Sequence, residues 1–110
     1  MIEPENLKLT SGAPLIYATI SLEKYDLNNI YAVVLTTEND VKIEGIFDSY
    51  IEDDLGDVIA VKYGFDKEEV LAGIVPVEDN EIVTLTVTGD IYSKWWEISF
   101  FGDDTIKIKS

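Results

Sequence analysis

The chain has 110 residues, of which 46% are apolar, and it carries a formal net charge of −14 at pH 7 because 22 carboxylates oppose only 8 basic side chains. A chain of this length fits one domain, and its apolar content is sufficient for a core, so the charge does not imply disorder. All the basic residues are lysines scattered along the sequence, which excludes a basic stripe that could neutralise nucleic-acid phosphates or an anionic membrane surface.

The cellular location is inferred from three features that the sequence does not contain: a membrane span, a signal peptide and cysteine. No apolar run approaches the roughly 18 residues of a membrane span, and the first residues are acidic where a signal peptide would be basic. There is no cysteine, hence no disulfide framework and no thiolate metal site. We therefore expect a cytoplasmic protein that has no contact with a membrane.

The N-terminal half reads as strands. Residues 1–14 are expected to form a loosely ordered arm. Residues 15–22 alternate, with apolar side chains at every second position from Ile16 to Leu22. Residues 30–37 are apolar on both faces, as expected of a central strand.

Residues 41–52 give a clear two-sided pattern. The expected inner face carries Val41, Ile43, Phe47 and Ile51, with Gly45 among them, and the outer face carries Lys42, Glu44, Asp48 and Glu52 together with Ile46 and Tyr50. Residues 37–40 (Thr-Glu-Asn-Asp) are typical of a reversal. We therefore predict a hairpin between residues 30–37 and 41–52.

A short helix is predicted after the next strand, which spans residues 58–63. Asp66 is followed three positions later by Glu69, the spacing of a capping box. Gly73 limits the helix to about two turns. Residues 70–77 also fit a strand.

The C-terminal third reads as three further strands. Residues 81–88 alternate between apolar side chains and threonines. Residues 95–101 and 105–109 are predicted to form a terminal hairpin around a turn at 101–104, in which Ile106 and Ile108 face inward and Lys107 and Lys109 face outward. Alternation requires Trp95 and Trp96 to face opposite sides of their strand. If Trp96, Ile98 and Phe100 point inward, then Trp95, Glu97, Ser99 and Phe101 point outward. Lysines on an edge strand discourage aggregation.

These elements predict an all-β fold, with at most one short helix, in which about seven or eight strands form either an antiparallel β-sandwich or a small β-barrel. Residues 33–35 and 41–47 resemble the first motif of Sm-like barrels. The RNA pocket and the basic second motif of that family have no counterpart in this chain, so the resemblance implies no shared function.

Neither catalysis nor a metal site is predicted. The chain has no histidine and no cysteine, so the usual general base and thiol nucleophile are missing. Glu44 with Asp48 or Glu52 has the pairing that glycosidases use, but alternating charges are typical of a solvated strand face. The acidic segment 52–57 has oxygen ligands suited to calcium, but the spacing of an EF-hand is absent and we favour a hydrated acidic turn. We expect no cofactor.

Exposed aromatic residues suggest an interface. Trp95 and Phe101 are predicted to face outward beside Glu97, an arrangement suited to anchoring a protein partner or stacking on a sugar ring. A sheet buried on both sides, or a homo-oligomer contact through this face, is the alternative.

The preferred function is that of a non-enzymatic acidic module that blocks a basic protein surface, as immunity proteins and phage-encoded inhibitors of host defence do. Its carboxylates would mimic phosphates and steer association, while apolar side chains would anchor the complex. The alternatives are a carbohydrate- or calcium-binding module and a phage or structural assembly subunit. The candidate partner-binding residues are Glu38, Asp40, Glu44, Asp48, Glu52, Asp53, Asp54, Asp57, Ile46, Tyr50, Trp95 and Phe101.

Overall fold

The computed structural model describes residues 3–4, 6–12, 14–22, 26–74, 81–92 and 95–107. Its elements, in chain order, are β1 (Asn6–Ser11), β2 (Leu15–Ser21), the 3-10 turn η1 (Leu27–Asn29), β3 (Ile30–Thr36), β4 (Lys42–Glu44), β5 (Ile46–Glu52), β6 (Val58–Asp66), α1 (Lys67–Ile74), β7 (Ile82–Tyr92) and β8 (Glu97–Lys107).

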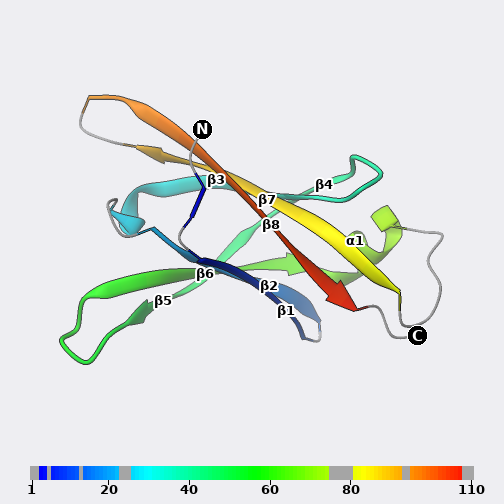
Figure 1. Ribbon diagram of the computed structural model, residues 1–110, viewed down its shortest axis with the longest axis horizontal. Coiled ribbons are helices and arrows are strands. Elements are labelled where there is room, and N and C mark those ends of the chain that lie inside the picture. The colour runs from blue at the N-terminus through cyan, green and yellow to red at the C-terminus, as the bar shows by residue number, and fades with distance from the viewer. Residues whose placement is uncertain are drawn as a thin grey trace.

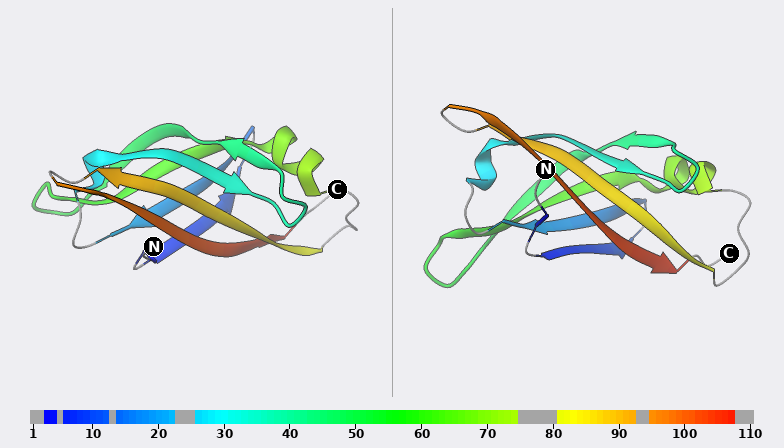
Figure 2. Two further views of the ribbon diagram at one scale, coloured as in Figure 1. Left: turned by 90° about the horizontal axis from the view of Figure 1, so that it is seen from above. Right: turned by 45° about the horizontal axis from the view of Figure 1, so that its top comes forward.

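The strands form two four-stranded antiparallel sheets. The first sheet has the order β1-β2-β6-β5 and the second has the order β4-β3-β7-β8. The strands of the two sheets cross one another in projection, and α1 covers one end (Figure 1). The side view shows the sheets as two layers (Figure 2). The all-β prediction with one short helix is confirmed, and of the two predicted architectures the chain adopts the sandwich.

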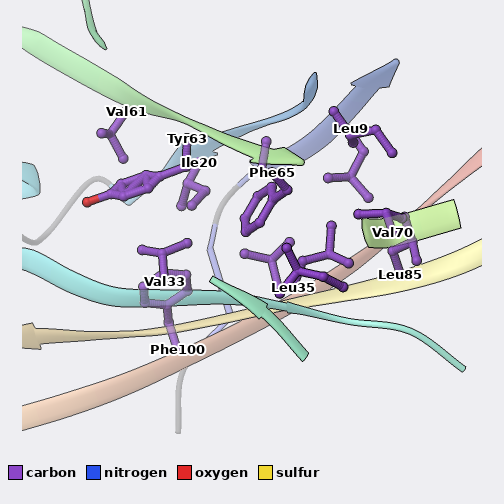
Figure 3. Packing of buried hydrophobic residues seen from close by; sticks show 14 of the residues in the cluster. Leu9, Ile20, Val33, Leu35, Val61, Tyr63, Phe65, Val70, Leu85 and Phe100 are labelled. Atoms are coloured by element: carbon purple, nitrogen blue, oxygen red, sulfur yellow. The ribbon is translucent and has the colours of Figure 1, made fainter. Parts of the chain in front are cut away.

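The core lies between the layers. Inward side chains from both sheets interdigitate there, together with Val70 from α1 (Figure 3). The predicted alternation of residues 15–22 and 81–88 is confirmed, because Ile16, Ile20 and Leu85 are fully buried. Burial of such side chains supplies most of the stability of a domain this size.

β4 and β5 are separated only by Gly45 and together connect the two sheets, and we call this segment, residues 42–52, the shared strand. The sequence predicts that all of it pairs with residues 30–37, which is wrong. Only β4 pairs with β3, whereas β5 pairs with β6 in the other sheet. The strand changes sheets at Gly45, whose amide donates to the Val33 carbonyl oxygen at 2.8 Å. A Cβ at position 45 would lie 3.0 Å from a Phe65 ring carbon and 3.0 Å from the Val33 carbonyl oxygen, so any other residue at the crossing would force one of these neighbours to shift by a few tenths of an ångström.

The sheets also approach each other at β1 and β8. The sequence predicts a loosely ordered arm over residues 1–14, but residues 6–11 form β1, which pairs with β2 along its length. The Leu9 amide, at the open edge of β1, donates to a carboxylate oxygen of Asp104 on β8 at 2.9 Å. This bond satisfies a polar group that an edge strand would otherwise leave to water.

β8 is longer than the sequence indicates. The predicted turn at 101–104 is wrong, because β8 runs without interruption from Glu97 to Lys107 and pairs with β7 throughout. Asp104 is half-buried within the strand, where its carboxylate accepts a hydrogen bond from the Leu9 amide of β1 instead of closing a turn. Ile106 is buried, as predicted, and residues 108–109 lie outside the described residues.

The predicted N-cap of α1 at Asp66, one half of the capping box, is confirmed. An Asp66 carboxylate oxygen accepts from the Glu69 amide at 3.2 Å. Residues 70–74 are helical, so the alternative strand is wrong for them, and residues 75–77 lie outside the described part of the chain. No helix in the described part is long and apolar enough to cross a membrane.

A candidate protein-binding edge

Eight carboxylates follow the shared strand and the turns at its two ends, and we call this set the acidic edge. It comprises Glu38, Asp40, Glu44, Asp48, Glu52, Asp53, Asp54 and Asp57, all of which are exposed. The β3–β4 turn lies near α1 and the β5–β6 turn lies at the opposite end of the molecule, whose longest extent is 44 Å (Figure 1). The structure therefore arranges these charges as a row and not as a compact patch.

The β3–β4 turn at one end of the row is rigidly built. The Thr37 amide donates to the Val41 carbonyl oxygen, and the Asp40 amide donates to the Thr37 carbonyl oxygen, both at 2.9 Å. Asp40 has φ of 64°, a left-handed conformation that aspartate and asparagine tolerate better than most residues. Glu38 accepts from the Thr84 amide of β7 at 3.2 Å. The Glu38 carboxylate consequently has a structural role as well as its charge, whereas Asp40 contributes its backbone conformation and amide to the turn.

The Thr37 hydroxyl ties this turn to α1. It donates to the Gly73 carbonyl oxygen at 2.9 Å and accepts from the Val41 amide at 3.1 Å. Asn39 also donates to Gly73, at 3.1 Å. Thr37 is buried, and its two bonds fix the position of the turn relative to the helix.

The β5–β6 turn at the other end is organised by one of its own acids. Asp53 accepts from the amides of Leu55 and Asp57 through one carboxylate oxygen, at 2.9 and 3.0 Å. Gly56 supplies the left-handed position, with φ of 83°. Among the described residues, no three potential ligands lie close enough together to hold a metal ion. Asp53 thus stabilises the turn, in the way aspartate commonly does.

Aromatic side chains accompany the acids along β5. The sequence alternation places Phe47 and Tyr50 on opposite faces, which is wrong. The register with β6 shifts between Phe47 and Ser49, so that a bulge at Asp48 brings both rings to one face. The ring centroids of Phe47 and Tyr50 lie 4.8 Å apart, and those of Phe47 and Tyr63 lie 5.9 Å apart. Phe47 was expected in the core, yet it is 47% exposed.

The remaining aromatic candidates lie elsewhere. Trp95 and Trp96 precede β8 and are 78% and 58% exposed, so the expectation that they face opposite sides of one strand, with only one of them exposed, is wrong. Strand alternation does not apply to them because β8 begins only at Glu97. Phe101 is half-buried on β8, which is separated from β4 by both β3 and β7 in the second sheet. The structure therefore does not bring Trp95 or Phe101 to the acidic edge.

A second set of acids, which the sequence reasoning missed, extends the acidic edge. An open groove of about 810 Å³ separates β4 from α1, and its walls include Lys42, Glu44, Asp66 and Glu69. The capping box revealed where α1 begins, but only the fold places α1 beside β4. By contrast, Lys8 and Lys62 share the outer face of the first sheet, where both flank Thr19 in the strand register.

Tyr63, which lies opposite Phe47 on β6, is the one described residue beside the acidic edge whose pKa departs from its ordinary value. Burial, followed by the nearby Tyr50, raises the pKa of the Tyr63 hydroxyl above its ordinary value. Its hydroxyl donates to the Ile30 carbonyl oxygen at 3.4 Å. The hydroxyl therefore stays neutral at physiological pH and faces the backbone of β3.

Comparison of the chain with protein-family models, curated proteins and solved structures gave no match. The function has to be inferred from the geometry of the surface.

Proposed function

We propose that this protein is a non-enzymatic acidic module that binds and blocks a basic surface of another protein in the cytoplasm. The observation that supports the proposal is the acidic edge: eight exposed carboxylates follow one strand and its two turns, with Lys42 as the single basic residue in that stretch. A row of one sign attracts a surface of the opposite sign and accelerates encounter.

The apolar side chains beside the acids favour a protein as the partner. Ile46 and Tyr50 are exposed on β5 between carboxylates, and Leu55 is exposed in the following turn. Interfaces combine such apolar anchors with a charged rim. Nucleic acid is excluded as a direct partner because phosphates would be repelled. The same repulsion argues against an anionic membrane.

The shape of the row suits mimicry of a phosphate backbone. Glu44, Asp48 and Glu52 recur every four residues on the shared strand, which corresponds to spacings of about 13 Å at the rise of an extended chain. Basic grooves that hold nucleic acid present their cations along a comparable line. Blocking the basic surface of a nuclease or toxin, in the manner of an immunity protein or a phage inhibitor of host defence, is the activity this geometry supports best.

The test is a capture experiment with charge-matched variants. The tagged wild-type protein, the variant Glu44→Gln/Asp48→Asn/Glu52→Gln and the control Glu68→Gln/Glu97→Gln/Asp103→Asn would be incubated with lysate of the source organism and of its host or competitor. All six positions are exposed, and each triple variant removes the same charge.

We expect a basic protein to be retained at about 50 mM salt by the wild type and the control but lost from the acidic-edge variant, and to be released at about 500 mM salt, where the screening length is severalfold shorter. Capture that does not differ between the two triple variants would contradict the proposal.

A further inference from the structure

A cleft of about 450 Å³ opens where β3 and the shared strand diverge. The ladder between them ends at the pair Val34 and Glu44, after which β5 turns away to join β6. The walls of this β3–β5 cleft include three aromatic side chains and one carboxylate: Tyr31, Phe47, Tyr63 and Glu44. Its volume lies in the range of about 300–1,000 Å³ typical of small-ligand sites.

Ring surfaces dominate the cleft. Tyr31 and Phe47 are both partly exposed, and the Phe47 ring packs edge-on against Tyr63 at an interplanar angle of 83°. Because the Tyr63 hydroxyl is directed to the Ile30 carbonyl oxygen, its ring and not its hydroxyl is available to a ligand. The negative faces of aromatic rings attract cations.

The backbone of β3 is strained at the cleft. Ala32 has φ of 54°, and the register of β3 with β7 shifts between Tyr31 and Val34. A left-handed conformation is energetically unfavourable for a non-glycine residue. Such bulges re-aim neighbouring side chains, and here the neighbours are residues that line the cleft.

The charge around the cleft selects the ligand. Among the described residues, Glu44 is the single charged one on its walls, and Asp48 and Glu52 continue the negative row along β5. We propose that the β3–β5 cleft binds an arginine side chain that projects from an extended segment of the basic partner, an inference that rests on the proposed function. A guanidinium can stack on Phe47 or Tyr31 and pair bidentately with Glu44, which a lysine ammonium cannot do.

The probes are three short peptides, acetylated and amidated, in which serine alternates with arginine, with lysine or with the neutral arginine analogue citrulline. Binding to the isotopically labelled protein would be followed by amide chemical shifts at about 150 mM salt, where long-range attraction is largely screened. The variants are Phe47→Leu, Tyr31→Leu and Glu44→Gln, with Tyr92→Leu and Glu97→Gln as controls outside the cleft and outside the acidic edge.

We expect the arginine peptide to bind about threefold to tenfold more tightly than the lysine peptide, and the citrulline peptide not to bind. Its shifts should centre on residues 30–34 and 44–47. Each cleft variant should weaken binding about threefold or more, whereas the controls should match the wild type. A native-like spectrum of each variant establishes that it folds. If Phe47→Leu does not fold, Tyr31→Leu alone tests the contribution of the aromatic rings.

Equal binding of the arginine and lysine peptides, or cleft variants that bind like the wild type, would overturn the proposal. Shifts that instead follow Asp48 and Glu52 toward the β5–β6 turn would also overturn it while leaving the acidic edge intact. Absence of peptide binding overturns the cleft proposal alone, because the proposed function is judged separately by capture with the two triple variants.

Discussion

Gly89→Ala tests the packing between the two sheets by adding a single carbon atom to the core. Gly89 lies on β7 opposite Phe100, and a Cβ at this position would sit 2.6 Å from two carbons of the Phe100 ring and 3.3 Å from Val33. Comfortable carbon contacts are about 3.5–4.0 Å, so each ring contact is too short by about 1 Å. Phe100 is fully buried and cannot swing into solvent.

The expected cost is about 3 kcal/mol, at the upper end of the usual range for overpacking. For a domain of this size that lowers the melting temperature by roughly 12–24 °C, at about 4–8 °C per kcal/mol. Chemical unfolding followed by circular dichroism gives the free energy directly. Gly56→Ala is the matched control: no atom lies within 4 Å of its Cβ, so only the left-handed strain of about 1 kcal/mol remains.

The double variant Gly89→Ala/Phe100→Leu separates crowding from other causes. Removing ring atoms should relieve the clash, so the double variant should be more stable than the sum of the two single effects by about 1 kcal/mol or more. A Gly89→Ala protein within about 0.5 kcal/mol of the wild type, or additive single effects, would refute the packing described for Phe100.

Three other outcomes follow from the structure. Stability should fall as pH rises above about 10, because Tyr63 ionises there in the unfolded chain, whereas the folded side chain, whose pKa is raised, keeps its proton. Tyr63→Phe should reduce this alkaline loss of stability, measured by urea unfolding at a series of pH values. An unchanged dependence of stability on pH in this variant would contradict the assignment to Tyr63. Thr37→Val should cost about 1–3 kcal/mol because it removes a hydroxyl bonded to the Gly73 carbonyl and the Val41 amide, and a neutral effect would show that these bonds contribute little. Tryptophan emission of the folded protein should resemble that of the unfolded chain and be quenched readily by acrylamide, because both tryptophans are exposed; a blue-shifted, protected component would contradict the exposure of Trp96.

Local patterns predicted the parts of the fold that depend on local causes. The alternation of residues 15–22 and 81–88 identified β2 and most of β7, because one face of each strand packs on the core. The capping box at Asp66 fixed the start of α1. In each case the signal and its cause lie within a few residues.

The failures have distant causes. The crossing at Gly45 depends on Phe65 and Val33, which only the folded chain brings together. Nothing in the residues around Asp104 shows that its carboxylate will accept a hydrogen bond from an edge amide of β1, 95 positions away. The bulge at Asp48 moves Tyr50 onto the face of Phe47, so strict alternation along β5 could not show that the two rings lie together.

The acids of the candidate site were visible in the sequence, but their arrangement was not. Composition identified the charge, and the run of carboxylates from Glu38 to Asp57 marked where it concentrates. Their extension to Asp66 and Glu69 requires α1 to pack beside β4, and the separation of Trp95 and Phe101 from the row requires the strand order of the second sheet.

The most direct test of the central claim is the association rate constant of the captured basic partner with the two triple variants. At about 50 mM salt, Glu44→Gln/Asp48→Asn/Glu52→Gln should associate about tenfold more slowly than the wild type and show a flatter salt dependence, while Glu68→Gln/Glu97→Gln/Asp103→Asn should associate nearly as fast as the wild type. Equal slowing by both variants would show that only the total charge matters and that the acidic edge is not the binding surface.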